Sequence, residues 1–335
     1  MKKLLILTHA RDNSADMVIR HLNNLSTPFI RFNTEEFHTR VKFTMRMDCF
    51  GEYSARYHFP DTTLPFEDIG AVWNRRVRTP ELPTIWSQEP DLQNWMIEEV
   101  RNALYISFTL FKAPVVNPWE TNERIKFNKI FQMRRAAELG FEVPLTCLTN
   151  NLEEMQQFWE TASGNVVLKK IRKGIFQMSG GKRYILHTAH LSPHQMSEDR
   201  IADFRFAPVL LQEHLEKKYD IRSVIIGERV FSFAIHSQES SRGKTDFRTA
   251  ALLGESLRHE AIDLGQEVNN KLVCYSRSFG LAFGVVDLVL TKDEHLVFLE
   301  DNPNGQWGWL EEKTGVLLSL AFAEYFTGII TSARV

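Results

Sequence analysis

The sequence predicts an α/β protein in which a small parallel unit precedes a longer region rich in antiparallel strands. Near the N-terminus, short apolar runs alternate with segments of helical spacing, which is the pattern of parallel strands joined by helices. In the last third of the chain, apolar runs follow one another across very short polar turns, which favours hairpins. The length of 335 residues is too great for one small core and suits two or three packed units.

The first third is predicted to form the parallel unit. Residues 4–8 are an apolar strand, and residues 12–14 (Asp-Asn-Ser) offer N-caps for a helix with one apolar stripe. Residues 28–32 and 71–73 are the next strand candidates. Together these elements predict a small N-terminal α/β domain over residues 1–118.

The middle of the chain is predicted to begin with one long helix. Apolar residues recur at helical spacing over residues 122–139, and Gly140 is a favoured helix terminator. Strands are expected over residues 143–146 and 165–170. The polar stretch over residues 187–205 has little periodicity and is expected to be either an extra helix or a mobile insertion.

The last third is predicted to be a series of antiparallel strands. Short turns at residues 227–229 and 292–294 separate neighbouring apolar runs. The strands are expected over residues 209–212, 221–226, 230–235, 283–290 and 296–300. The rest of the chain is thereby divided into a central region over residues 119–208 and a C-terminal region over residues 209–335.

The composition limits the classes of partner. The chain has 40 basic and 42 acidic residues and a formal charge of -2. This balance suits neither a protein that encloses nucleic acid nor a protein that binds anionic membranes. No stretch approaches the ~18 uninterrupted apolar residues of a membrane helix, so a soluble protein is expected. The three cysteines are far apart and form no zinc or disulfide pattern. A reducing cytoplasm is therefore the predicted location.

Three oxygen-bearing side chains on late strands predict a magnesium site. Asp287 lies within a valine-rich strand, where a charge is costly unless it pairs or binds a metal. Glu300 and Asn302 follow another strand two residues apart, so both face the same side. Such oxygens suit Mg²⁺, which takes its other ligands from water and phosphates. A buried Asp satisfied by backbone donors is an equal alternative for Asp287 alone, but the repeated pattern favours the metal.

Two lysines are candidates for phosphate binding. Lys129 on the long helix and Lys169 at the end of an apolar strand could reach phosphate oxygens from opposite sides. Either lysine alone is more often solvated. The glycine-containing loop over residues 173–182 could lay backbone amides over phosphates, although it matches neither a Walker A nor a GxGxxG pattern.

A strand end is the candidate for adenine binding. The strand that ends at Gln212 and Glu213 leaves its sheet at Leu215, and its backbone could offer adenine a donor and an acceptor. Asp220 could then accept hydrogen bonds from ribose hydroxyls. Taken alone, this segment is better interpreted as a plain strand and turn with solvated charges.

Several short motifs, in their order along the chain, resemble those of the ATP-grasp superfamily. They are Asn128-Lys129, Val167-Leu168-Lys169, Gln212-Glu213, Asp220-Ile221-Arg222, Asp246-Phe247-Arg248, Val286-Asp287 and Leu299-Glu300-Asp301-Asn302-Pro303. Finer features resemble the MvdC/MvdD branch, the microviridin-type ligases that make graspetides and are related to S6 glutamate ligases. These features are Leu5-Ile6-Leu7-Thr8, Arg31-Phe32-Asn33-Thr34, Val72-Trp73-Asn74-Arg75-Arg76, Val116-Asn117-Pro118 and Asn302-Pro303-Asn304-Gly305-Gln306-Trp307.

The resemblance implies an ATP-grasp fold that binds ATP and Mg²⁺. The implied site comprises nucleotide contacts (Lys129, Lys169, Gln212, Glu213, Leu215, Asp220), magnesium ligands (Asp287, Glu300, Asn302) and two arginines on the reacting side (Arg248, Arg222). Arg248 would touch the γ-phosphate or an acyl phosphate. Asp301 stands where the family usually has an aliphatic residue, and Phe247 where it often has Trp. Neither departure removes a ligand.

The resemblance also implies a reaction and a partner. An Asp or Glu side chain of a ribosomal precursor peptide would be activated as an acyl phosphate and joined to a Thr or Ser hydroxyl or a Lys amine. Ester and amide products both remain open, with ester slightly favoured. The peptide's leader would dock on the central domain, for which residues 172–205 are the candidate. Arg75, Arg76 and Arg78 could meet acidic residues of the core, although solvated or internally paired arginines are the better interpretation.

Rival functions remain open. One is an S6-type ligase that adds amino acids to a protein or small acceptor, and another is a nucleotide-binding regulator without turnover. No Ser/His/Asp or Cys/His set is present in the sequence, and His214 and His236 are better interpreted as structural than as general bases. A homodimer is in keeping with the superfamily.

Overall fold

The computed structural model describes residues 1–81, 89–172, 175–177, 183–185, 188–197, 204, 206–240 and 243–333. Most of the loop proposed over phosphates (173–182) and much of the candidate dock (172–205) lie outside these residues. Within the dock, residues 188–197 hold the short strand β12 (Ala189–His190) and one 3-10 turn. The hairpin of β10 (Ile175–Gln177) and β11 (Arg183–Ile185) pairs antiparallel.

The N-terminal sheet is parallel, as the alternation of strands and helices predicts. It contains β2 (Phe29–Asn33), β1 (Lys3–Thr8), β6 (Ile69–Asn74) and β7 (Val115–Val116), in that spatial order. Helix α1 (Asn13–Asn24) begins at Asp12, whose side chain accepts from the Ala15 amide. A separate antiparallel sheet of β3 (Lys42–Met47), β4 (Tyr53–His58) and β5 (Thr63–Pro65), and the long helix α2 (Pro90–Thr109), are not foreseen from the sequence.

The prediction of a single helix over residues 122–139 is wrong. The segment forms α3 (Trp119–Ile125) and α4 (Lys129–Glu138), and the Asn128 side chain caps α4 by accepting from the Phe131 amide at 3.1 Å. Lys129 is therefore the first residue of a new helix. The strand expected over residues 143–146 is also displaced: β8 covers Thr146–Thr149, because Pro144 has no amide hydrogen to give to the ladder.

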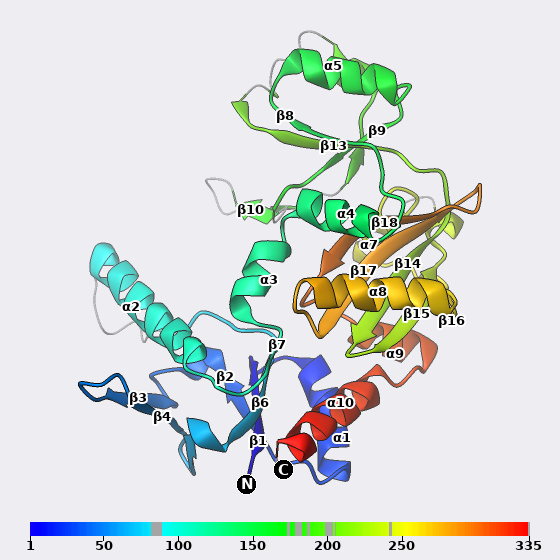
Figure 1. The fold of residues 1–335 in the computed structure, drawn as a ribbon. Helices are drawn as coiled ribbons and strands as arrows, with labels where there is room; N and C mark the ends of the chain where they lie inside the picture. The colour runs from blue at the N-terminus through cyan, green and yellow to red at the C-terminus, as the bar shows by residue number, and fades with distance from the viewer. Residues whose placement is uncertain are drawn as a thin grey trace.

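The central region is a small layer of strands and one helix. The antiparallel sheet has the order β12, β9 (Val166–Lys169), β13 (Val209–Glu213) and β8. Helix α5 (Leu152–Thr161) lies against it, at the end of the molecule farthest from the N-terminal sheet in Figure 1. The expected strand over residues 165–170 is thus confirmed within one residue at each end.

The C-terminal region is an antiparallel sheet, as predicted. Its strands lie in the order β16 (His259–Ile262), β15 (Arg229–Ile235), β14 (Lys217–Ile226), β17 (Phe283–Thr291) and β18 (Leu296–Asn302). The short turns at Gly227 and Asp293 join neighbouring strands. Helices α7 (Phe247–Leu252), α8 (Gln266–Ser278), α9 (Gly308–Thr314) and α10 (Leu318–Ser332) complete the region.

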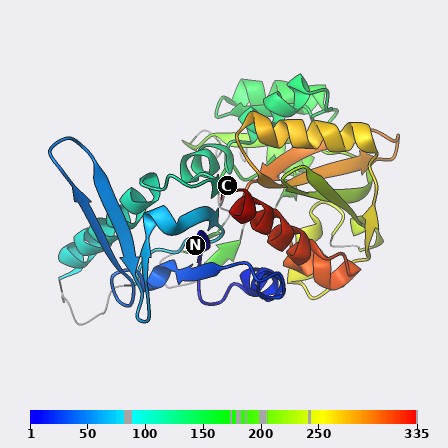
Figure 2. The same cartoon turned by 60° about the horizontal axis from the view of Figure 1, so that its bottom comes forward.

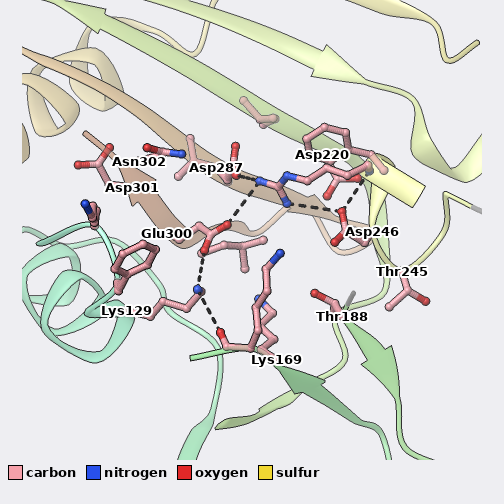
Figure 3. Close-up of a pocket in the computed structure, with 18 of the residues that line it drawn as sticks. Lys129, Lys169, Thr188, Asp220, Thr245, Asp246, Asp287, Glu300, Asp301 and Asn302 are labelled. Carbon is pink, nitrogen blue, oxygen red and sulfur yellow. Dashed lines mark hydrogen bonds and ion pairs between the residues drawn. The ribbon is translucent and has the colours of Figure 1, made fainter. Parts of the chain in front are cut away.

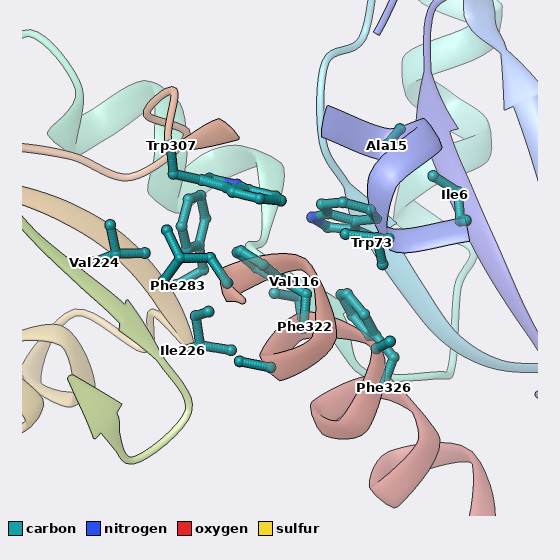
Figure 4. Packing of buried hydrophobic residues seen from close by; sticks show 14 of the residues in the cluster. Ile6, Ala15, Trp73, Val116, Val224, Ile226, Phe283, Trp307, Phe322 and Phe326 are labelled. Carbon is teal, nitrogen blue, oxygen red and sulfur yellow. The ribbon is translucent and has the colours of Figure 1, made fainter. Parts of the chain in front are cut away.

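The N-terminal sheet and the C-terminal helices share one hydrophobic core. Helix α10 lies beside α1, and both chain ends lie close together (Figures 1 and 2). In this core Phe322 stacks on Trp73 and on Trp307, with ring centroids 5.5 and 4.9 Å apart (Figure 4). The domain boundaries at residues 118 and 208 stay predictions.

The described helices do not include a candidate membrane span. Among the helices of the described residues, none has both the length and the apolar character needed to cross a bilayer.

Candidate functional site

A cavity of about 270 Å³ lies where the C-terminal sheet faces α4 and the end of β9. Its lining includes seven of the predicted site residues and also Asp246, and Figure 3 shows the labelled side chains among them converging from several elements. They are Lys129, Lys169, Asp220, Asp246, Arg248, Asp287, Glu300 and Asn302. Residues distant in sequence therefore meet in one polar pocket.

Two carboxylates form the centre of this cavity. Asp287 in β17 stands opposite Glu300 in β18 in the strand register. Arg222 donates to Asp287 Oδ1 at 2.7 Å, and Arg248 donates to Asp287 Oδ2. Glu300 Oε1 lies 3.4 Å from Arg248, and its Oε2 lies 3.0 Å from Lys129 Nζ. Each carboxylate is thus held by two cationic side chains.

The electrostatics of the cavity keep Glu300 ionised. Burial raises the pKa of Glu300, but Lys129, Arg248 and Lys169 outweigh it and lower the pKa to about 2. The pKa of Arg248 shows the reciprocal effect: burial lowers it, and Asp287, Glu300 and Asp246 together raise it above its usual value. Glu300 therefore carries a negative charge in the cavity at neutral pH.

The donor set suits a hard cation. Two carboxylates on adjacent strands and the amide of Asn302, the last residue of β18, all line the same cavity. Asn302 is exposed, and its Oδ1 accepts from the Asn304 amide at 3.2 Å. Oxygen donors of this kind, few in number and open to solvent on one side, fit Mg²⁺ bound together with phosphates.

Lys169 lines the same cavity and is half-buried. Burial lowers its pKa to about 8, although Glu300 opposes this effect. Lys129 and Arg248 add to the lowering because they are positively charged. Figure 3 shows the Lys169 ammonium directed toward the acidic centre. An anionic phosphate group would compensate this crowding of cations.

We expect ADP binding to weaken at alkaline pH because of Lys169. Above its pKa of about 8, the free protein loses a proton that the phosphates need, so affinity should fall by up to about tenfold per pH unit. Calorimetric titration of ADP between pH 7 and 9.5 would measure this. Lys169→Arg is the matched variant, since its guanidinium stays charged throughout. An equally steep loss in that variant would contradict the assignment.

A second cavity adjoins the first and contains the predicted adenine segment. It is lined by Gln212, Glu213 and Leu215, and it shares Lys169 and Lys217 with the first cavity. The side chains of two of these residues have structural partners. Gln212 donates to Thr146 Oγ1 at 2.9 Å, and Glu213 Oε1 accepts from the Leu145 amide at 2.8 Å.

Asp220 has a partner that the sequence does not indicate. Lys217 Nζ donates to Asp220 Oδ1 at 2.7 Å, and both side chains are buried. Residues three apart on a regular strand point to opposite faces, but the pairing of β14 with β17 shifts register between Lys217 and Tyr219. That bulge turns Lys217 toward Asp220. No local sequence signal announces such a shift.

The structure places the two arginines differently. Arg248 lines the cavity, whereas Arg222 is buried behind Asp287 and also donates to the Gln306 carbonyl at 2.9 Å. Asp246, which has no assigned role in the sequence reasoning, contacts Arg248 at 3.5 Å. Its place two residues before Arg248 in the same motif is the signal that could have identified it.

The histidines and N-terminal arginines lie outside the acidic centre. His214 lines the second cavity, where burial lowers its pKa and His190 adds to that effect. His236 contacts Glu260 at 3.2 Å on the outer part of the sheet. Arg75 is completely buried, while Arg76 is half-buried and Arg78 is exposed. For Arg75, the internally paired interpretation is confirmed.

The chain is similar to known proteins both in sequence and in structure. The family model for the MvdD pre-ATP grasp domain matches residues 3–123. An ATP-grasp ligase from Chryseobacterium gregarium, RiPP-associated and solved with ADP and a leader and core peptide, superposes with a TM-score of 0.88 at 25% identity, covering 97% of this chain and 96% of that one. The chain has the fold of an MvdD-like ATP-grasp ligase. This confirms the resemblance inferred from the ordered motifs.

Further solved structures share the MvdD-like ATP-grasp fold. The macrocyclase MdnC of Microcystis aeruginosa MRC, bound with precursor peptide MdnA, gives a TM-score of 0.83 at 26% identity over 97% of this chain and 99% of that one. The ATP-grasp ligase PsnB, complexed with minimal precursor, Mg and ADP, gives 0.72 at 18% identity over 99% and 98%. At that identity PsnB shows the fold alone. No curated protein matches this sequence.

Proposed function

We propose that this chain is an ATP-dependent carboxylate ligase whose substrate is a ribosomally made precursor peptide. The observation that carries the proposal is the acidic pair Asp287 and Glu300, held by Arg222, Arg248 and Lys129 in a cavity that adjoins a second cavity at the end of β13. One structure that matches the chain over almost its whole length was solved with ADP and a leader and core peptide, and another was solved with a precursor peptide.

The nucleotide occupies the two adjoining cavities. Backbone groups near Glu213 and Leu215 receive the adenine, with Gln212 fixing the strand end through Thr146. Asp220 accepts from the ribose. Lys169 and Lys129 meet the phosphates, and an arriving phosphate relieves the repulsion between these two lysines.

Asp287, Glu300 and Asn302 are the residues that would hold Mg²⁺. When bound there, the ion would neutralise phosphate charge and polarise the γ-phosphoryl group. A bound divalent cation would replace the charge that Arg248 supplies to these carboxylates, and Arg248 would then be available to the transferred phosphoryl group. Arg222, buried behind Asp287, orients that carboxylate rather than touching substrate.

The reaction has two displacement steps. An oxygen of a substrate Asp or Glu carboxylate attacks the γ-phosphorus, the bond to the β–γ bridging oxygen breaks, and ADP leaves with that electron pair. A hydroxyl or amine then attacks the acyl carbon, inorganic phosphate departs, and the nucleophile loses its proton. Positioning and charge neutralisation account for both steps, so no protein nucleophile is required.

The proposal extends to product, partners and location. Thr or Ser hydroxyls would give macrolactones and Lys amines would give macrolactams. Of the two products, we propose the macrolactone, which is an ester. The leader of the peptide docks on the central region within residues 172–205, and Arg76 and Arg78 are available to acidic residues of the core. The protein works in the cytoplasm, with a homodimer as its working assembly.

Mass spectrometry tests the proposal directly. The protein is incubated with Mg-ATP and a Thr/Ser- and Asp/Glu-rich peptide encoded beside it, and the peptide is weighed before and after mild alkaline hydrolysis. Loss of one water per ring that base reverses indicates esters, and base-stable loss indicates lactams. The control omits ATP.

Other outcomes of that experiment point elsewhere. ATP consumption with an unchanged peptide would contradict the peptide assignment. A gain in mass of the acceptor when free amino acids are added would then indicate an S6-type ligase. Neither turnover nor a mass change across several peptides indicates a nucleotide-binding regulator instead.

A further inference from the structure

A completely buried arginine of the N-terminal sheet grips the loop that follows the acidic strand β18. Arg75 comes directly after β6, and its Nη1 donates to the Gly305 carbonyl at 3.1 Å and to Asn304 Oδ1 at 3.4 Å. Its Nη2 donates to Gln306 Oε1 at 3.1 Å. One guanidinium therefore contacts three successive residues of the loop, more than 200 positions away in sequence.

The molecule compensates the burial of this charge. Asp12 Oδ2 lies 3.5 Å from Arg75 Nε, and Thr8 Oγ1 donates to the same carboxylate oxygen at 2.7 Å. The ring centroids of Trp73 and Trp307 lie 6.0 and 5.9 Å from the guanidinium carbon. A buried charge needs such partners, which marks this arginine as fixed rather than mobile.

The gripped loop is bonded to the acidic centre on its other side. The backbone N–H of Asn304 donates to Asn302 Oδ1 at 3.2 Å, and the backbone N–H of Gly305 donates to the Asn302 carbonyl at 3.0 Å. The Gln306 carbonyl accepts from Arg222, which in turn donates to Asp287. Two of the three proposed magnesium ligands are thus connected to Arg75 through short hydrogen-bonded paths.

A second contact secures the same loop. Asn117 donates to the Pro303 carbonyl at 2.7 Å, and Asn304 donates to the Asn74 carbonyl at 3.3 Å. Gly305 packs so closely that an added Cβ would lie 2.6 Å from Val285 Cβ. The loop therefore has little freedom while these contacts hold.

We propose that Arg75 is a positioning residue for the magnesium site: through residues 304–306 it fixes the orientations of Asn302 and of the Arg222–Asp287 pair. It touches neither nucleotide nor metal. The N-terminal domain thereby helps set the metal affinity of a site formed by the C-terminal sheet. The inference rests on the proposed nucleotide and magnesium site but is independent of which peptide, or which acceptor, the protein modifies.

The chemistry of the contact requires the guanidinium. Its planar fork reaches a carbonyl and two side-chain oxygens at once, whereas an ammonium is a point charge on a longer, flexible stem. Arg75→Lys keeps the charge that balances Asp12 but loses most of the loop contacts. Arg20→Lys is the matched control, because Arg20 is an exposed arginine of α1 in the same domain and lines neither cavity.

Calorimetric titration of ADP at a series of Mg²⁺ concentrations tests the proposal. Loss of an outer contact to metal ligands typically weakens metal binding about 10–100-fold, so Arg75→Lys should raise the Mg²⁺ concentration for half-maximal enhancement of ADP binding about tenfold. ADP affinity in EDTA should stay unchanged. Arg20→Lys should match the wild type in both measurements.

A second variant guards against misfolding of the first. Asn304→Ala leaves Arg75 and its partner Asp12 in place but removes both contacts of the Asn304 side chain, with Arg75 and with the Asn74 carbonyl. It should raise the Mg²⁺ requirement about fivefold. Thermal unfolding in EDTA verifies that each variant is folded. An unaltered Mg²⁺ requirement in the folded variants would overturn the positioning role. If wild-type ADP binding itself ignores Mg²⁺, the proposed metal site fails as well, and the two failures are told apart by the wild-type curve.

Discussion

Asp287→Asn is expected to lower the turnover number about a thousandfold. Asp287 accepts from both Arg222 and Arg248 and lines the cavity opposite Glu300. The amide keeps the size of the side chain but removes the negative charge, so the magnesium ligand is weakened and two arginines lose their partner. Loss of about 4 kcal/mol of transition-state stabilisation, the scale of several kcal/mol that a metal supplies, corresponds to that factor.

Coupled assay of ADP release with saturating peptide and Mg²⁺ would measure the effect. Asp293→Asn, in the exposed turn between β17 and β18, removes one negative charge nearby and should retain wild-type turnover. Circular dichroism on both variants excludes unfolding as the cause. Turnover within tenfold of the wild type in Asp287→Asn would contradict the proposed role of this carboxylate.

Asp301→Asn is expected to stabilise the metal-free protein at alkaline pH. Asp301 lies between two proposed metal ligands, but its side chain is buried on the opposite face of β18, 2% exposed. Burial, together with Asp287 and Glu300, raises its pKa to about 7. An ionised carboxylate is therefore disfavoured in the folded state, whereas the neutral amide is not.

The sign of the pH effect follows from proton binding. The folded protein holds the Asp301 proton up to about pH 7, while the unfolded chain releases it near pH ~3.9. Wild-type stability should therefore decline relative to the variant between these values. At pH 8 in EDTA we expect Asp301→Asn to be more stable by about 2–4 kcal/mol, a difference that disappears near pH ~4.

Urea unfolding followed by tryptophan fluorescence would measure this difference. Asp61→Asn, an exposed aspartate in a turn, is the control and should show no pH-dependent gain. A wild-type protein that is as stable as Asp301→Asn at pH 8 would mean that the buried carboxylate is compensated. The aliphatic residue usual at this position in the resembling family is consistent with the expected gain.

The sequence allowed the parallel N-terminal strands and the C-terminal hairpins to be predicted because both depend on local patterns. Apolar runs and turn residues determine where β1, β14 and β17 lie. The cavity residues were also accessible, since Glu300 and Asn302 stand together in one motif. By contrast, the break before α4 depends on a cap at Asn128 that competes with an otherwise continuous helical pattern.

What could not be predicted depends on contacts between distant segments. The Lys217–Asp220 pair requires a register shift between two strands. Arg75 looked like part of a basic run, yet its partner Asp12 lies more than 60 positions earlier and its loop contacts lie near the other end of the chain. The contacts of such side chains form only after the sheets have assembled, so no local sequence pattern indicates them.

The packing of α10 against α1 has a consequence for synthesis. Residues Leu318–Ser332 cover Trp73 and the neighbouring face of β6, although that strand leaves the ribosome long before the helix does. Domains generally fold in order as the chain emerges. The aromatic face of the first sheet therefore stays uncovered until residues Leu318–Ser332 have been translated. Ribosome-bound chains that end before Leu318 should therefore recruit chaperones, and release from them should coincide with the arrival of α10.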